Sequence, residues 1–324
     1  WVQYFFFAMD ARHGWTKLHS LCMEGDSSDI GEDMEPLVGA VTDSGNTPLH
    51  FACARPSVKR IAHRLIKMGG NILAPNSDGQ TPLHIGAAHL LPAELDSLLL
   101  QANPKTIDVK DSVGCTPLHW AIQQSFTCIG TCVTLLCAGA SAEAHDANGD
   151  TPMHYAAREG KFKLFKLLVE AGGNPDARNS RGLAPIHVAC EVDDDEFVAA
   201  YLFAYRKEMP VTTRSQSTML HVAARNGAQT VAEAIIDFFG RRVVDVHDKY
   251  GQSPLVVAVA NKNFEVADLL ESAGAEVPSN CVLAMRIARG VIPEYGSDSD
   301  DSDLDEGFAT TCSDNASFRT LLAA

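Results

Sequence analysis

Histidine and cysteine are the residue types in this sequence whose side chains could bind a metal or carry nucleophilic chemistry. Seven of the twelve histidines occupy the same place in a recurring hexapeptide: they are His19, His50, His84, His119, His154, His187 and His221. One histidine per repeat puts neighbours about 10 Å apart, the usual separation of packed helices. A tetrahedral zinc ion needs its ligands at about 2 Å. We therefore predict neither a shared metal site nor catalysis at these rings.

The nine cysteines could serve as thiolate ligands or form disulfides. Their odd number, scattered through helical patterns, is typical of reduced thiols in an intracellular protein. Cys128 and Cys132 have the i, i+4 spacing that places two side chains on one helix face, and Cys137 follows nearby. No Cys-x-x-Cys pair occurs, and no histidine nearby completes a known ligand set. We interpret them as small buried thiols and predict no metal, no cofactor and a cytoplasmic or nuclear location.

Catalytic signatures are missing from the sequence. It contains no phosphate-binding loop, no Gly-x-Ser-x-Gly elbow, no His-Glu-x-x-His and no kinase motif set. Residues 277–324 lie beyond the repeated region and are too few and too acidic for a catalytic domain. We predict that the chain is not an enzyme.

The hexapeptide Gly-x-Thr-Pro-Leu-His organises the body of the chain. It occurs at residues 45–50, 79–84 and 114–119. Residues 149–154 carry Met153 in place of leucine, and looser copies begin at Gly14, Gly182, Gln216 and Gly251. Successive copies start 31 to 35 residues apart. A fixed period of this length is the signature of a stacked repeat architecture.

The fourth good copy, residues 146–174, shows how one unit folds. Thr151 is a helix N-cap, and Pro152 stands at the first helical position, where its missing N–H costs nothing. Gly160 ends this first helix, and a second helix follows. We expect the buried face of the second helix to consist of Phe162, Phe165, Leu167 and Leu168.

This pattern resembles the ankyrin repeat, a unit of about 33 residues with two helices and a turn. The resemblance implies an all-α ankyrin-repeat solenoid over residues 10–276, with about seven full repeats and a degenerate N-terminal one. It also implies that the repeated histidines are structural and bond to the backbone within and between repeats. Each copy needs its neighbours to bury its apolar face.

By this resemblance, the function is non-catalytic binding of one or more proteins across a concave face made by finger turns and first helices. The adaptable positions flank the motif glycine or follow the paired alanines. The residues that we expect to contact a partner are Trp15, Asn46, Gln80, Gln123, Gln124, Ala147, Asn148, Asp150, Arg158, Glu159, Arg181, Arg225, Asn226, Tyr250 and Gln252. We set Trp120 and Tyr155 aside as partly buried.

The formal charge of −15 is unevenly distributed. Residues 291–324 contain eight acids and one base, so this tail carries −7. A block of like charge with few apolar residues is predicted to be disordered. The acidic balance argues against nucleic-acid binding, and no apolar run approaches the 18 or so residues of a membrane span. We expect a monomer without membrane insertion, whose protein partner carries a basic surface.

The ends of the chain carry further expectations. The first residue is Trp1, and residues 1–9 are interpreted as an upstream extension or a disordered segment. Residues 277–290 are predicted to form a short C-terminal helix. Ser297 and Ser302 each have an acid three residues on, a pattern that resembles acidophilic kinase sites and predicts phosphorylation.

Two other functions stay open at this point. An acidic tail after an ankyrin array loosely resembles the inhibitor-of-kappa-B proteins, which implies a regulator that masks a basic partner with residues 291–324. Alternatively, the repeats form the targeting or sensing segment of a larger enzyme or channel, because the first residue is not methionine.

The fifth copy inserts five acids within residues 191–196, between its two helices. We expect these acids to lie in a solvated loop.

Overall fold

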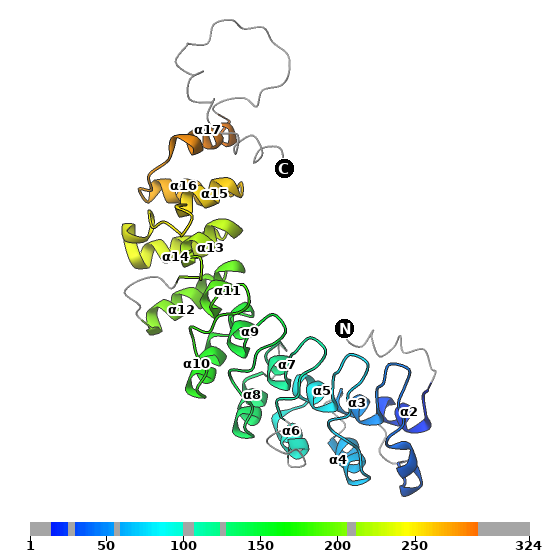
Figure 1. Cartoon of the computed structure of the whole chain (residues 1–324). Coiled ribbons are helices and arrows are strands. Elements are labelled where there is room, and N and C mark those ends of the chain that lie inside the picture. Colours follow the sequence, from blue (N-terminus) through cyan, green and yellow to red (C-terminus); the bar gives the residue numbers. More distant parts are fainter. Residues whose placement is uncertain are drawn as a thin grey trace, which may run out of the picture. The chain divides into compact units, whose positions relative to one another are not determined.

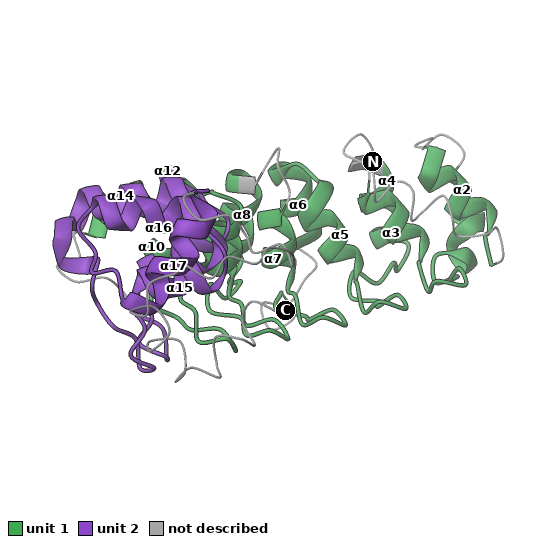
Figure 2. Ribbon diagram, turned by 90° about the horizontal axis from the view of Figure 1, so that it is seen from above, with its two compact units in different colours: residues 1–189, 196–206 green, residues 190–195, 207–324 purple. Residues whose placement is uncertain are grey.

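The computed structural model describes residues 14–24, 30–54, 59–99, 107–123, 128–205 and 212–290. Within these ranges the regular structure is helical, and the one β-type pairing is an isolated bridge between Thr212 and Thr218. The predicted all-α class is confirmed. The chain divides into two compact units (Figure 2). Unit 1 comprises Trp1–Ala189 and Glu196–Arg206, and unit 2 comprises Cys190–Asp195 and Lys207–Ala324.

Unit 1 is built from pairs of short helices joined by finger-like turns (Figure 1). Its elements are α2 (Lys17–Glu24), η1 (Glu32–Leu37), α3 (Pro48–Cys53), α4 (Lys59–Lys67), α5 (Pro82–His89), α6 (Pro92–Leu99), α7 (Pro117–Gln123), α8 (Cys128–Cys137), α9 (Pro152–Arg158) and α10 (Phe162–Glu170). Two further helices, α11 (Pro185–Glu191) and α12 (Asp195–Tyr205), contribute residues to both units.

The helices of unit 1 stack in two rows. The first helices α2, α3, α5, α7 and α9 each contact the next in order, and the second helices α4, α6 and α8 do the same. The motif leucines Leu49, Leu83 and Leu118 are at most 1% exposed between them. Full burial of one such side chain contributes about 1.5–3 kcal/mol, so the stacking of neighbours creates the core.

The first copy departs from the pattern in its second half. After α2 it continues into the 3₁₀ helix η1, in which Met34 is the only buried residue. Glu32, Asp33 and Glu35 of η1 are exposed. The copy therefore has a polar second half in place of an amphipathic helix.

The fourth good copy begins and ends as its capping residues predict. α9 starts at Pro152 after the N-cap Thr151, and Gly160 adopts a left-handed conformation with φ of 64°. The predicted buried face of α10 was partly wrong. Leu164, Phe165 and Leu168 are buried, whereas Phe162 and Leu167 are half-buried. The helix starts at Phe162, so the buried stripe is offset from the predicted one.

Unit 2 repeats the same construction with α13 (Met219–Asn226), α14 (Gln229–Phe239), η3 (Gly240–Val243), α15 (Pro254–Ala260), α16 (Phe264–Ser272) and α17 (Ser279–Ala288). α13 contacts α15, and α14 contacts α16. α17 packs against both α15 and α16. Arg289 donates to Asp268 at 2.6 Å and also pairs with Glu271, which ties the end of α17 to α16.

One acid of the fifth-copy insertion has a structural role within unit 2. Asp193 adopts φ of 56°, and its Oδ1 accepts from the Thr230 hydroxyl at 3.0 Å and from the Val231 N–H at 3.1 Å. A carboxylate at the N-terminal turn of a helix satisfies free N–H groups and favours the helix dipole. Asp193 thus caps α14 while its side chain stays exposed, as expected for the insertion.

Candidate functional site

A side-chain acceptor three residues before the motif glycine shapes each finger turn. The Oδ1 atom of Asp146 accepts from the backbone N–H groups of Asn148 and Asp150, both at 2.8 Å. Equivalent pairs of bonds, to residues two and four positions further on, are made by Asn76, Asp111 and Asp248, and by the Thr213 hydroxyl. These turns are therefore closed from within, without any contact to a partner.

The fingers are also joined to one another through their backbones. In unit 1, Ala147 N–H donates to the Val113 carbonyl at 2.9 Å, and Ser180 N–H donates to the Asn148 carbonyl at 2.9 Å. In unit 2, Lys249 N–H donates to the Ser215 carbonyl at 3.0 Å. We call this series of bonds the fingertip ladder. Because backbone groups make it, the tip side chains are free to vary.

The motif histidines anchor the base of each finger. The Nδ1 atom of His119 accepts from the Thr116 N–H at 3.1 Å, so Nε2 carries the proton and donates to the Asp150 carbonyl of the next copy at 3.3 Å. His19, His50, His84, His154 and His221 make the corresponding bonds to the carbonyls of Asn46, Gln80, Cys115, Leu183 and Gln252. The structural role implied by the ankyrin resemblance is confirmed for these rings.

Burial favours the neutral form of His50, His84, His119, His154 and His221 by lowering their pKa. Desolvation lowers the pKa of His50 and of His119 to about 4, although the carbonyl that each ring contacts favours the charged form. Burial also lowers the pKa of His221, although the Gln252 carbonyl and the negative charge of Asp248 act in the opposite direction. Among the described residues no three His, Cys, Asp or Glu side chains are grouped so that they could hold a metal ion.

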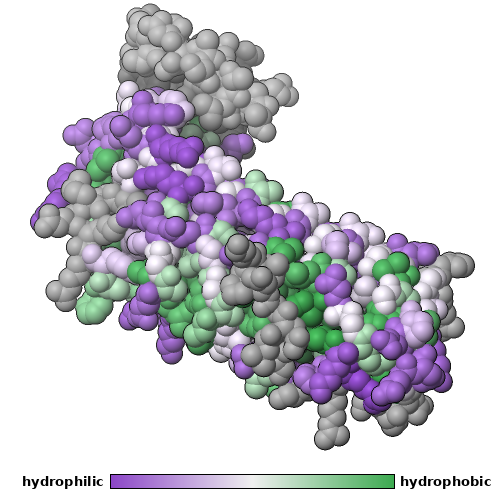
Figure 3. All heavy atoms as spheres, turned by 60° about the horizontal axis from the view of Figure 1, so that its bottom comes forward, coloured by the Kyte–Doolittle hydropathy of each residue, from purple (hydrophilic) through white to green (hydrophobic). Residues whose placement is uncertain are grey.

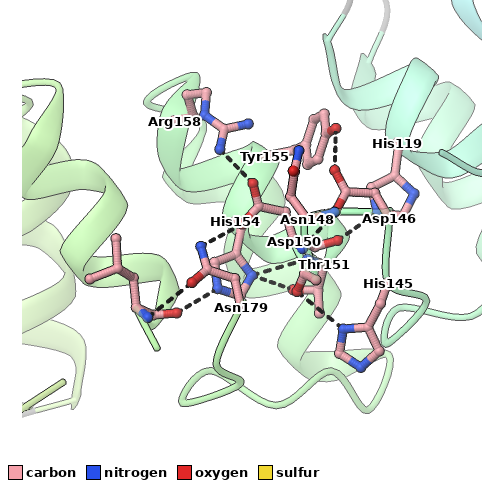
Figure 4. A network of polar contacts seen from close by, with 12 residues as sticks. His119, His145, Asp146, Asn148, Asp150, Thr151, His154, Tyr155, Arg158 and Asn179 are labelled. Carbon is pink, nitrogen blue, oxygen red and sulfur yellow. Dashed lines mark hydrogen bonds and ion pairs between the residues drawn. The ribbon is translucent and has the colours of Figure 1, made fainter. Parts of the chain in front are cut away.

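A buried polar network links the third and fourth fingers of unit 1 (Figure 4). The Tyr155 hydroxyl donates to Asp146 Oδ2 at 3.0 Å and lies 3.2 Å from Cys115 Sγ. Since the tyrosine proton is used by the aspartate, the thiol is the donor to the phenol oxygen. Burial, followed by the contact with Cys115, raises the pKa of Tyr155. In the preceding copy Trp120 Nε1 donates to Asp111 Oδ2 at 2.9 Å in the same way.

Asp150 continues this network toward the next copy (Figure 4). Its Oδ2 accepts from Arg158 Nη2 at 2.7 Å, and its Oδ1 accepts from Asn179 Nδ2 at 2.7 Å. Burial alone would raise the pKa of Asp150, but the bonds from Arg158 and Asn179 bring it below its ordinary value. The Arg158 guanidinium also lies 5.1 Å from the centroid of the Tyr155 ring. Arg158 is therefore held in place by its neighbours.

The structure places fourteen of the fifteen residues predicted from sequence in three environments. The exposed ones are Gln123, Ala147, Asn148, Glu159, Arg181, Arg225, Asn226, Tyr250 and Gln252. Trp15, Gln80 and Arg158 are half-buried, whereas Asn46 and Asp150 are buried. Gln124, Ser297 and Ser302 lie outside the described residues, as do residues 1–9 and 291–324.

The half-buried and buried members are occupied by contacts within the chain. Asn46 Oδ1 accepts from Asn76 Nδ2 at 3.0 Å. The Trp15 ring packs on Phe51 with centroids 4.9 Å apart. These residues, together with Asp150 and Arg158, brace the fingers.

Six residues that fix the fingers were not predicted from the sequence: Asn76, Asp111, Asp146, Asn179, Thr213 and Asp248. A signal for them existed in the sequence. Each stands three residues before the first residue of its hexapeptide, and an aromatic residue follows nine positions after Asp111 and Asp146. The aspartate and the aromatic residue nine positions later can bond only after the finger turn and the start of the helix bring them together.

Comparison with known proteins gives matches along most of the described chain. The family profile "Ankyrin repeats (3 copies)" matches residues 92–179, 126–210 and 186–281, and the profile "Ankyrin repeat" matches residues 44–77. The mouse B-cell lymphoma 3 protein homolog is 30% identical over 228 residues, covering 67% of this chain and 43% of that protein.

Two further relatives illustrate the range of proteins that contain similar repeats. The fruit-fly tyrosine-protein kinase Shark is 33% identical over 52% of this chain, which corresponds to 18% of the kinase. The chicken nuclear factor NF-kappa-B p105 subunit is 27% identical over 62% of this chain and 21% of its own length. The chain thus matches less than half the length of each of these relatives. Among the described residues, no helix combines the length and the apolar character that crossing a bilayer requires.

Proposed function

Because this chain belongs to the ankyrin-repeat family, we propose that it is a non-catalytic adaptor that binds a protein partner through its fingers and first helices. Ankyrin repeats are protein-interaction modules, and the residues predicted for this role include nine that are exposed. The observation that carries the proposal is the fingertip ladder, which satisfies the tip backbones internally.

A surface of this kind suits binding for a thermodynamic reason. Ordering loops and side chains on association costs free energy, and a surface that is already ordered avoids much of that cost. In unit 1 the tip residues Ala147 and Asn148 are exposed, whereas the side chains that hold them, Asp146 and Asp150, are buried. Substitution at the tips can therefore change affinity for a partner without changing the frame.

The proposal is tested with charge changes on the finger side of the fourth copy. Once a partner has been isolated with the full chain, the double variant Asn148→Arg and Glu159→Arg is expected to bind it at least about 10-fold more weakly. Arg158 is unsuitable for this purpose because its reversal would leave the buried Asp150 carboxylate unpaired. Binding is measured by calorimetry with the purified partner.

A matched control uses the other side of the same copy. Lys163 and Lys166 are exposed on α10, and the variant Lys163→Glu and Lys166→Glu is expected to bind within about 2-fold of the wild type, as for charges outside an interface. If the α10 variant lost the partner and the finger variant kept it, the finger assignment would be wrong.

A second candidate function is an inhibitor-type regulator that covers a basic partner with residues 291–324. It is favoured by the charge of −7 in this segment and by the similarity to the B-cell lymphoma 3 protein homolog and the p105 subunit. Replacing the acids of 298–306 with their amides is expected to weaken association with such a partner and to flatten its salt dependence. If both stay unchanged, the acidic segment does not contact the partner.

A further inference from the structure

The fingers of unit 2 carry basic charge only. In the turns 212–218 and 247–253 the charged side chains at the surface are Arg214 and Lys249, with His247 beside them. The single acid of these turns, Asp248, is 6% exposed, and its Oδ1 atom accepts from two backbone N–H groups. No carboxylate of either turn is therefore available to neutralise Arg214 and Lys249.

Five exposed acids of unit 2 lie on its second helices, namely Glu233 and Asp237 of α14 and Glu265, Asp268 and Glu271 of α16. Three more, Asp193, Asp195 and Glu276, are also exposed and lie outside the two turns that carry Arg214 and Lys249. Figure 3 shows hydrophilic side chains covering the face of unit 2 that this view brings forward. Unit 2 is thus polarised, with basic fingers and acidic second helices.

The basic fingers are held in a fixed arrangement with an aromatic tip. The Lys249–Ser215 backbone bond joins the two turns, and Gln252 is bonded to His221 Nε2 at 2.9 Å. Tyr250 is 70% exposed, and the Lys249 ammonium lies 4.8 Å from its ring centroid. A rigid site with two cations and an exposed aromatic ring fits an extended acidic peptide that contains occasional apolar residues.

We propose that the basic fingers of unit 2, formed by Arg214, Lys249 and Tyr250, bind the acidic segment 294–306 of the same chain. This segment contains seven acids and no base, together with Tyr295 and Leu304. The acids of the segment match the two cations of the fingers, and Tyr295 and Leu304 can pack on the exposed Tyr250 ring.

The connection between the two sites is short. Segment 294–306 begins four residues after Gly290, and the preceding helix α17 packs against α15, which directly follows the finger 247–253. Residues 291–306 can span up to about 55 Å when extended. This reach covers a site on the neighbouring copy, since packed helices lie about 10 Å apart.

The consequence is self-occupancy of part of the finger surface. A tethered segment has an effective concentration of the order of 1 mM, so it competes with an external acidic ligand for the same fingers. The competition matters for the proposed function only if a partner also binds these fingers. Binding of the acidic segment is tested without a partner, so this proposal can fail while the proposed function holds, and the reverse.

The test compares two full-length chains and a labelled peptide. In one chain the six acids of 298–306 are replaced by their amides, which leaves the described residues unchanged. The probe is a fluorescent peptide with the sequence of residues 294–307, titrated by anisotropy at low salt. The amide-substituted chain is expected to bind the peptide about 10-fold more tightly than the intact chain, in which the tethered segment competes. Binding should weaken about 10-fold or more in 0.5 M salt.

Two further variants of the amide-substituted chain locate the site. Arg214→Glu with Lys249→Glu is expected to lose at least about 10-fold in affinity, whereas Arg242→Glu with Arg286→Glu, the same charge change elsewhere in unit 2, should stay within about 2-fold. Circular dichroism and the thermal midpoint verify that both fold. Equal loss in the two variants, equal binding by the intact and substituted chains, or a dimer of the intact chain held by segment exchange would each overturn the proposal.

Discussion

The motif histidine anchors the base of each finger, because one ring contacts both its own helix start and the following copy. Nδ1 of His50 accepts from Thr47, and Nε2 donates to the Gln80 carbonyl 30 residues on. The ring performs this role only in its neutral form, since a protonated ring has two donors and cannot accept from Thr47. Protonation of this one side chain therefore disrupts the cap of its own helix and makes the stability of the fold depend on pH.

This chemistry predicts that acid destabilises the fold before most carboxylates titrate. The pKa of His50 and His119 is about 4 in the folded chain against an ordinary 6.5. Between these values the unfolded state binds more protons, so stability is complete above pH 6.5 and falls as the pH drops toward 4. At pH 5 the free energy of unfolding is expected to be lower than at pH 7 by about 2 kcal/mol for each of these two rings. Urea unfolding at pH 7 and pH 5 measures the loss.

The variant His119→Gln provides the control for that prediction. It is expected to be less stable than the wild type at pH 7 but to lose less stability between pH 7 and pH 5. A wild-type free energy of unfolding that stayed constant from pH 7 to pH 5 would contradict the neutral state assigned to these rings.

At the scale of single elements, helix ends in this protein are satisfied by residues from outside the helix. α14 receives the carboxylate of Asp193, and the carbonyls of Ala224 and Arg225 at the end of α13 accept from Asn263 Nδ2, both at 2.9 Å. Helices of six to eleven residues are marginal alone. Capping by residues of a neighbouring copy is therefore one reason why the copies depend on one another.

Replacement of Asp193 tests this dependence. Asp193→Ala is expected to lower the free energy of unfolding by about 1–2 kcal/mol, because α14 loses its cap and alanine is strained at φ of 56°. Asp193→Asn keeps an acceptor and tolerates that φ, so it should stay within about 0.5 kcal/mol of the wild type. Chemical denaturation followed by circular dichroism distinguishes them, and Glu196→Ala serves as the neighbouring control. Equal stability of the alanine and asparagine variants would show that the cap contributes nothing.

Much of the element structure was predictable from sequence, and the reasons are local. Thr151, Pro152 and Gly160 determine where α9 starts and what ends it through their own backbone preferences. The buried face of α10 was less predictable, because the exact start of the helix decides whether Phe162 or Leu164 faces the core. The pairing of Asp146 with Tyr155 required the folded finger, since the two positions meet only after the turn closes.

The candidate site was predictable only as a set of positions. The hexapeptide register marked Ala147 and Asn148 as tip residues, and both are exposed. Register alone could not distinguish Asn148 from Asp150, two residues later in the same turn. Asp150 is buried because its carboxylate is shared between Arg158 and Asn179, and those partners come from a helix end and from the next copy.

At the scale of the whole molecule, stability is a sum of contributions from copies and from contacts between neighbours. Leu83 of α5 is fully buried, and α5 contacts α3 and α7. Leu83→Ala is expected to cost about 3 kcal/mol and to accelerate amide hydrogen exchange mainly in α3, α5 and α7, with α15 and α16 little affected. Hydrogen exchange read out by mass spectrometry measures this, and uniform acceleration over all helices would show that the chain unfolds as one cooperative unit.

The fingertip ladder has a consequence for how such a chain can change in length over evolution. Each described rung is a backbone N–H of one copy on a backbone carbonyl of the copy before it, so each such copy presents the donor that its predecessor needs and the acceptor that its successor needs. A duplicated copy, inserted in register, would therefore already contain both the backbone donor and the backbone acceptor that its two neighbours require. New recognition surfaces could thus arise by duplication followed by divergence at tip positions such as 147 and 148, while the joints themselves stay untouched by mutation of side chains.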